Sequence, residues 1–229
     1  MIDPLRVARA GVLLVWTTFF VYLRATGEIT RYLGPRTYWV VTFGAVVLAA
    51  SFLAQAAAVR SERPRRVSAA TLVGLTVMVM PVVAVLAIPE ATLGALAAGR
   101  KNAAVAGGAA GAVPDATGRD PSFSEIHFAG GNEEYARALG VTDGTSVSLT
   151  GFVTHPPEAP PGTYGLTRFY VSCCAADAIP YTVFVADGAA RREDAWLEVT
   201  GVLERRGERF VVVPREVREV APPSDPYLY

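Results

Sequence analysis

The chain is poor in the residues that most often carry out chemistry. Its 229 residues include two cysteines, two histidines and a single lysine, Lys101. No Ser–His–acid triad, glycine-rich phosphate loop or paired-carboxylate motif is recognisable. We therefore expect a protein that is not an enzyme.

Charged residues are also scarce. They make up 18% of the chain, compared with about 25% in a typical soluble domain, whereas hydrophobic residues make up 52%. This composition excludes a disordered chain and is difficult to reconcile with one soluble domain. The zero net charge hides two halves of opposite sign: residues 1–120 carry 12 basic and 6 acidic side chains, and residues 121–229 carry 9 and 15. A basic, apolar half followed by an acidic half is typical of a membrane anchor joined to a soluble domain.

Two uncharged apolar runs are long enough to cross a membrane. Residues 37–59 and 67–89 each provide 23 residues without a charge, more than the ~20 needed to span ~30 Å of hydrocarbon. An earlier run, residues 10–23, is shorter, but Arg6 and Arg9 before it can extend toward the lipid headgroups. It lacks the small-x-small cleavage site of a signal peptide. The sequence predicts three transmembrane helices, over about 7–23, 37–59 and 67–89, in a membrane domain of residues 1–101.

The basic loop of residues 60–66 predicts the orientation of these helices. Positively charged loops stay in the cytoplasm, so this loop and the N-terminus are expected inside the cell. Three spans in the lipid bilayer then place the C-terminal domain outside the cytoplasm, on a multi-pass protein of the cell membrane. No acid, histidine or lysine lies deep in any span, whereas ion pathways usually need such groups. The chain alone is therefore not expected to be a pump or a channel.

The second half of the chain predicts an all-β domain. Residues 102–120 form an Ala/Gly-rich linker that cannot build a core. Polar and apolar residues then alternate over five segments, as in half-buried strands. Gly151 and Gly201 each interrupt such a segment, and a glycine in mid-strand usually marks a bend or bulge. Together these features favour an OB-like five-stranded barrel over residues 121–220, followed by a tail of residues 221–229; a small sandwich is the alternative.

The charge of this domain bears on its partners. OB barrels often bind single-stranded nucleic acid through a basic groove. Residues 121–229 carry a net charge of −6, so binding to phosphates would be repulsive on average. We expect no nucleic-acid partner.

The two cysteines are adjacent, and an acid follows them closely. Cys173 and Cys174 lie at the expected end of the second strand, and Asp177 comes three residues later. Three interpretations are open. The cysteines could be small buried residues that close a turn, with Asp177 accepting backbone N–H bonds. The three residues could bind a soft metal ion such as zinc or copper(I), although zinc prefers four ligands and a Cys-x-x-Cys spacing. The thiols could also form a redox pair.

The histidines add at most one ligand to this group. His155 should start the loop after the first strand, roughly 20 Å from the cysteines if the strands are antiparallel. His127 precedes the barrel and is free to approach them. We therefore include His127, and not His155, among the candidate ligands.

Four segments resemble the YcgQ-like bacterial membrane proteins. They are residues 19–33, 168–177, 196–201 and 225–229, and the similarity extends over nearly the whole chain. The resemblance implies a subunit that pairs with a separate multi-span, YcgR-like permease, with a connection to metal homeostasis, zinc in particular. Some relatives carry a histidine-rich stretch between the second and third spans. The corresponding loop here, residues 60–66, contains no histidine, so metal binding would depend on the candidate residues named above.

The expected function is thus an accessory subunit of a two-component permease. An extracytoplasmic metal-binding module that uses Cys173, Cys174 and Asp177 is the first alternative, and a membrane-tethered thiol redox protein is the second. The tail ends in Pro226, Tyr227 and Tyr229, which we interpret either as a strand that docks on a partner or as a frayed end.

Overall fold

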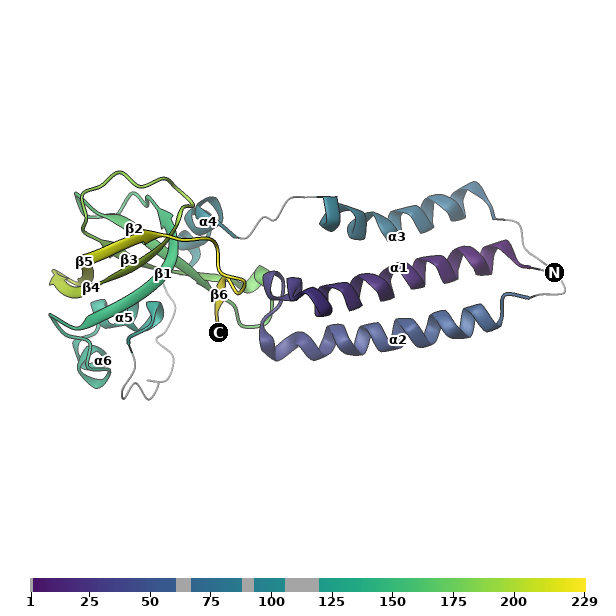
Figure 1. Cartoon of the computed structure of the whole chain (residues 1–229), viewed down its shortest axis with the longest axis horizontal. Coiled ribbons are helices and arrows are strands. Elements are labelled where there is room, and N and C mark those ends of the chain that lie inside the picture. Colours follow the sequence, from purple (N-terminus) through teal and green to yellow (C-terminus); the bar gives the residue numbers. More distant parts are fainter. Residues whose placement is uncertain (1, 61–66, 88–92, 106–119) are drawn as a thin grey trace. The chain divides into compact units, whose positions relative to one another are not determined.

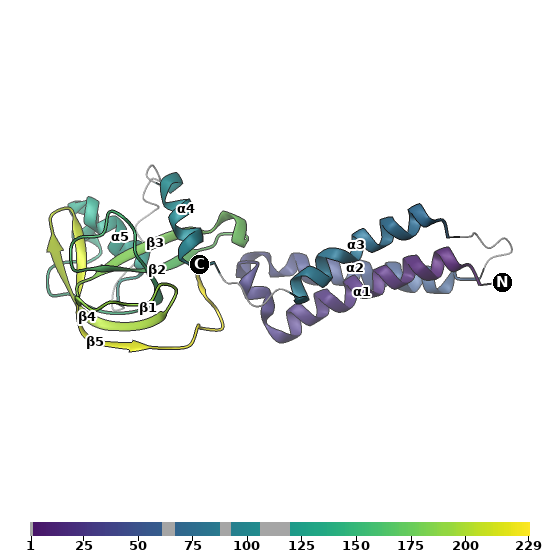
Figure 2. The same ribbon diagram turned by 90° about the horizontal axis from the view of Figure 1, so that it is seen from above.

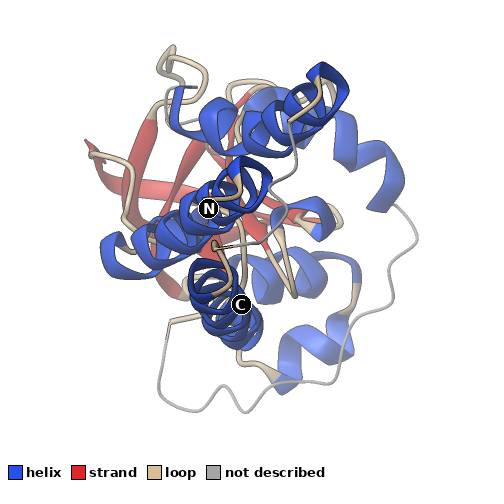
Figure 3. Cartoon of the chain, turned by 90° about the vertical axis from the view of Figure 1, so that its right-hand side faces the viewer, coloured by secondary structure: helices blue, strands red, loops and turns tan. Residues whose placement is uncertain are grey.

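The chain folds into two compact units, Met1–Ala91 and Thr92–Tyr229. In the computed structural model, residues 2–60, 67–87, 93–105 and 120–229 are described. The described part of the first unit consists of helices with the turns and loops between them. Within the described residues, the strands of the sheet belong to the second unit. Figure 3 draws these strands in red and the helices in blue.

Three long apolar helices form the first unit. They are α1 (Pro4–Thr26), α2 (Tyr38–Ala57) and α3 (Ala69–Ala87), with two short 3-10 turns, η1 (Glu28–Arg31) and η2 (Pro35–Thr37), between α1 and α2. All three helices are long and apolar enough to cross a membrane, which confirms the predicted number of long apolar helices. Helix α1 packs against both α2 and α3 (Figure 1).

Local sequence explains where α1 begins and ends. The Asp3 carboxylate accepts hydrogen bonds from the backbone N–H groups of Leu5 (3.0 Å) and Arg6 (3.4 Å), which caps the N-terminus. Gly27 ends the helix with a φ of 80°, a left-handed conformation that glycine adopts without strain. Asp3 also donates its N–H to the carbonyl of Val59 (2.9 Å), so the start of α1 is fixed beside the end of α2.

The second unit is a closed barrel with additional helices. Its strands are β1 (Ser146–Thr154), β2 (Tyr164–Tyr170), β3 (Ile179–Val185), β4 (Trp196–Arg206), β5 (Arg209–Glu219) and the short β6 (Tyr227–Leu228). The sheet order is β1–β4–β5–β3–β2–β6, and β1 also pairs with β2, which closes a five-stranded barrel (Figure 2). This confirms the predicted OB-like architecture. The helices of this unit are α4 (Ala95–Val105), α5 (Phe123–Gly131) and α6 (Glu133–Ala138), and η3 (Ala175–Asp177) is a 3-10 turn.

The two mid-strand glycines lie where strands approach most closely. A Cβ atom on Gly151 would come within 2.7 Å of the carbonyl oxygen of Thr167, and one on Gly201 would overlap the carbonyl oxygen of Val213. The β4–β5 register also shifts between Thr200 and Gly201. The bends predicted from these glycines therefore reflect crowding between strands.

The barrel has an interior core and a second apolar cluster on its outside. Inside, fully buried side chains from the five strands pack together with α5 and α6. Outside, Phe152, Phe169 and Trp196 form a patch that contacts Ala95 and Ala98 of α4. Because the α4 residues are small, the helix lies close to the aromatic rings and shields them from water.

Helix α4 belongs to a different unit from the one expected from the sequence. Residues 95–101 were assigned to the membrane domain, whereas in the structure they pack on the barrel. The physical reason is the outer aromatic patch, which is shielded from water only if an apolar segment packs on it. Helix α4, which precedes the linker in sequence, is that segment. Of the expected linker, residues 102–105 complete α4, and residues 106–119 lie outside the described part of the chain.

Candidate functional site

The two cysteines lie on a tight loop that follows β2, and Asp177 organises it. Its carboxylate accepts hydrogen bonds from the backbone N–H groups of Ser172 (3.1 Å), Cys173 (2.8 Å) and Cys174 (3.4 Å). An aspartate that bonds nearby backbone in this way fixes a turn. The loop of residues 172–177 is therefore held in shape without any bound ion.

This loop brings three possible metal ligands together at the surface. The two sulfur atoms are 3.7 Å apart and are not joined by a disulfide, and the sulfurs and an oxygen of Asp177 all lie within 4.8 Å of one another. Cys173 is exposed, while Cys174 and Asp177 are half-buried. Neither cysteine is a buried residue that merely fills a turn.

The electrostatics of the loop keep Cys173 protonated. A hydrogen bond from the thiol to Asp177, reinforced by one to the Cys174 sulfur, raises the pKa of Cys173 to about 11. Burial acts to raise the pKa of Asp177, but the bonds from the Cys173 thiol and from the loop N–H groups outweigh it, so this pKa lies below its usual value. At neutral pH the site thus holds a carboxylate and a protonated thiol. A metal ion would displace the thiol proton, because only the thiolate is a ligand.

Lys101 of α4 supports the same loop from the other side. Its Nζ donates to the carbonyl oxygens of Ala175 (3.4 Å), Ala176 (3.0 Å) and Ala178 (2.9 Å). These carbonyls surround the 3-10 turn between Cys174 and Asp177. No local pattern connects Lys101 with the cysteines, and its being the only lysine in the chain is the one signal that singles it out.

The C-terminal tail is fastened next to this loop. Strand β6 pairs in parallel with the end of β2, and Val171 donates its N–H to the carbonyl of Leu228 (2.9 Å). The half-buried guanidinium of Arg168 donates to the carbonyls of Asp225 (2.7 Å), Pro226 (3.3 Å) and Tyr227 (3.5 Å). Two of the segments that carry the family resemblance, residues 168–177 and 225–229, therefore form one structure.

This arrangement bears on the residues considered for partner docking. Pro226 and Tyr227 are buried in their own barrel, where Tyr227 is 4% exposed. Tyr229 is 44% exposed, and its hydroxyl donates to the Asp225 carboxylate (2.8 Å). Of the three, Tyr229 presents the largest surface to a partner.

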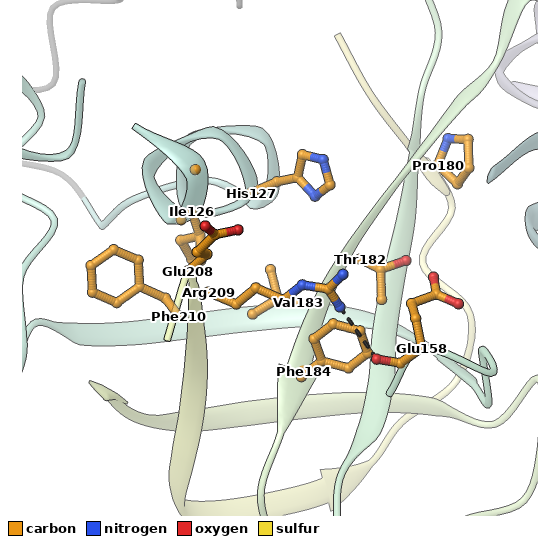
Figure 4. Close-up of a pocket in the computed structure, with 12 residues that line it drawn as sticks. Ile126, His127, Glu158, Pro180, Thr182, Val183, Phe184, Glu208, Arg209 and Phe210 are labelled. Carbon is orange, nitrogen blue, oxygen red and sulfur yellow. Dashed lines mark hydrogen bonds between the residues drawn. The ribbon is translucent and has the colours of Figure 1, made fainter. Parts of the chain in front are cut away.

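His127 lies in a different place, a pocket of about 320 Å³ beside α5 (Figure 4). Its ring contacts those of Phe128 and Tyr181, with centroids 5.5 and 5.6 Å away. Burial lowers the pKa of His127. A hydrogen bond with the Thr182 backbone acts to raise this pKa, and the positive charge of nearby Arg209 acts to lower it further. His127 is not among the residues whose ligand atoms gather near Cys173. His155 is also outside that group, and its Nε2 lies 2.9 Å from the carbonyl oxygen of Arg191.

The chemistry of the His127 pocket is mixed. The Arg209 guanidinium lies over the ring of Phe184, 5.3 Å from its centroid, and donates to the carbonyl of Glu158 (3.3 Å). Figure 4 shows this guanidinium with the side chains of Glu158 and Glu208 on either side. Two acids and one arginine give the pocket no clear preference for a charged ligand. The Cys173–Cys174–Asp177 loop is therefore the stronger candidate site.

Comparison with known proteins identifies both halves of the chain. The profile of the DUF1980 N-terminal domain matches residues 8–104, and that of the DUF1980 C-terminal domain matches residues 123–229. No curated protein and no solved structure shows significant similarity to it. With three membrane-type helices, a closed barrel and matches to both domains in the expected order, the chain belongs to the DUF1980 family.

Proposed function

We propose that this protein is a non-enzymatic, membrane-anchored accessory subunit that binds a zinc ion at Cys173, Cys174 and Asp177 and serves a separate multi-span permease. The observation that carries the proposal is the preformed loop, in which two thiols and a carboxylate converge at the protein surface. Thiolate and carboxylate are ligands that zinc accepts.

The spacing of the sulfur atoms fits a tetrahedral ion. Two thiolates bound to one zinc ion, with Zn–S bonds of about 2.3 Å and a tetrahedral angle, lie about 3.8 Å apart. The sulfurs of Cys173 and Cys174 are 3.7 Å apart. A linear two-coordinate ion would need them farther apart, at twice the bond length. This comparison favours zinc over copper(I).

The number of ligands suits exchange of the ion. Structural zinc sites normally have four protein ligands, whereas this loop offers three and Cys173 is exposed. A fourth position left open can take a water molecule or a ligand from another protein. The site is thus suited to receiving an ion or passing it on.

The membrane helices support an accessory role. No acid, histidine or lysine occurs in residues 10–23, in α2 or in α3, so these helices offer no polar pathway of their own. The resemblance to YcgQ-like proteins supplies the expected partner, a multi-span permease. The basic loop of residues 60–66 supports an extracytoplasmic barrel, where the site would meet ions before or after transport.

The Cys173 thiol is poorly suited to redox catalysis. Catalytic cysteines react as thiolates and usually have a lowered pKa, whereas the pKa of Cys173 is raised to about 11. A thiol oxidoreductase is therefore the weaker alternative.

A zinc titration of the full chain in detergent micelles tests the metal site. Wild-type protein should bind one zinc ion, and Cys173→Ser and Cys174→Ser should each weaken binding at least about tenfold, because one of three ligands is lost. Ser172→Ala is the matched control, since Ser172 supports the loop through its backbone N–H, which alanine retains. Equal affinity in all four proteins would remove the metal site from the proposal.

Purification from native membranes tests the partnership. An affinity-tagged chain, extracted in mild detergent after brief cross-linking, should carry a multi-span membrane protein in stoichiometric amount. Recovery of the chain alone would contradict the accessory role. It would not bear on the zinc site, which the titration tests independently.

A further inference from the structure

A polar pocket lies between α1 and α2 at the end where the chain begins. It has a volume of about 540 Å³ and is lined by Arg6, Arg9, Leu13, Ser51, Ala54, Gln55 and Ala58. It joins the first turns of α1 to the last turns of α2. This combination of two arginines, an amide and a hydroxyl with aliphatic side chains is unusual for a surface that faces lipid.

The length of α1 explains why the arginines there need a counter-charge. Between Arg9 and Arg24 lie 14 uncharged residues, which extend about 21 Å along a helix. The hydrocarbon layer is about 30 Å thick. At least one of these two arginines must therefore lie at the depth of the hydrocarbon edge, where an unpaired charge is costly.

The two ends of α1 differ in how they meet this requirement. The Arg24 guanidinium lies over the ring of Tyr38, 5.6 Å from its centroid. Arg9 is exposed and makes no ion pair or hydrogen bond with the residues that the structure describes. The pocket wall beside Arg9 thus carries a positive charge that the described residues do not neutralise.

Among the described residues, the carboxylate of Asp3 lies next to the pocket and is already engaged. Asp3 is 3% exposed, caps α1 and lies 3.7 Å from the Nε of Arg6. Arg6 also donates to the carbonyl of Ala58. With Asp3 balancing one of the two arginines, the pocket retains about one positive charge. The sequence adds four arginines and one glutamate in residues 60–66, immediately after α2.

We propose that this pocket binds the phosphate headgroup of an anionic phospholipid. Arg9 and the Gln55 amide contact the phosphodiester, and Leu13, Ala54 and Ala58 contact the start of the acyl chains. The apolar part of the wall selects a lipid over free phosphate. Basic pockets between membrane helices hold anionic headgroups by the same chemistry.

Native mass spectrometry of the delipidated full chain in neutral detergent tests this site. Phosphatidylglycerol and phosphatidylcholine with identical acyl chains are offered in equal amounts. Wild-type protein should retain phosphatidylglycerol preferentially, and Arg9→Gln should reduce that preference about fivefold, the contribution of one arginine near a membrane surface. Gln55→Leu should also reduce it while leaving every charge in place, so the test does not depend on Arg9→Gln folding.

Arg36→Gln is the matched control, because Arg36 is an exposed arginine beyond the other end of α1. It should leave the lipid preference unchanged. Equal retention of both lipids by the wild type would overturn the proposal, as would an equal loss in Arg36→Gln and Arg9→Gln. Displacement of the lipid by millimolar inorganic phosphate would contradict the choice of a lipid as the ligand.

Discussion

Asp177 and the two cysteines show what a local sequence pattern can and cannot predict. In one of the three interpretations of the spacing, Asp177 accepts backbone N–H bonds, and three such bonds are present. Neighbouring residues of a strand face opposite sides, so Cys173 and Cys174 can point the same way only if the strand has already turned. It has: β2 ends at Tyr170, before both cysteines. Where a strand ends depends on its partners, here β3 and the tail, and those contacts are not visible in the local sequence.

Alkylation of Cys173 should depend on pH in an unusual way. Because the pKa of Cys173 is raised to about 11, the thiolate remains a minor species at neutral pH, and the iodoacetamide rate should keep rising up to about pH 11. Asp177→Asn removes the carboxylate that holds the proton, so it should speed alkylation at pH 8 by about tenfold or more. Tandem mass spectrometry can follow Cys173 separately from Cys174. A wild-type rate that levels off near pH 8.5 would contradict this description of the loop.

At the scale of the elements, α4 is the helix whose role could not be predicted. Its small, weakly apolar side chains resemble a spacer as much as a packing surface. In the structure its first turn and its middle are fixed to the barrel: the Asp194 carboxylate accepts the N–H of Ala95 (2.6 Å), and Lys101 bonds carbonyls in and next to η3. These partners are about 75 to 100 residues away in sequence, and no local pattern indicates contacts of that range. The barrel strands were easier to predict because alternation and mid-strand glycines are local signals.

Lys101 should act as a positioning residue for zinc. Lys101→Met removes three hydrogen bonds around the turn that sets the distance between Cys174 and Asp177, and loss of such a supporting contact typically lowers metal affinity about tenfold. Lys101→Arg keeps the charge and should restore part of the affinity. Competition with a zinc-binding dye measures both variants.

Arg100→Met is the matched control for Lys101→Met, because Arg100 is an exposed neighbour on the same helix. It should bind zinc as the wild type does. If Lys101→Met lowers the melting temperature but leaves the zinc affinity unchanged, Lys101 supports the fold and not the site.

At the scale of the whole molecule, composition and charge predicted the division into an apolar helical half and a β domain. The three apolar helices and the closed barrel confirm it. The tail was harder to interpret, because its local sequence does not distinguish a strand that docks on another surface from a frayed end. Its placement depends on Arg168, whose guanidinium reaches carbonyls 57 to 59 residues away.

The tail and α4 together explain why the candidate site is attached firmly to the barrel. Strand β6 extends the sheet beside the end of β2, and Lys101 holds the turn after the cysteines. The site therefore combines residues from the strand, its following loop and a helix from before the linker. A metal ion bound there would be presented at the surface on a rigid support.

X-ray absorption at the zinc edge of the zinc-loaded full chain tests the central claim most directly. Coordination by Cys173 and Cys174 predicts about two sulfur neighbours at about 2.3 Å, together with lighter oxygen or nitrogen ligands. Cys173→Ser should reduce the sulfur count to about one. A first shell of oxygen and nitrogen alone, in protein that still binds zinc, would show that the two cysteines are not the metal ligands.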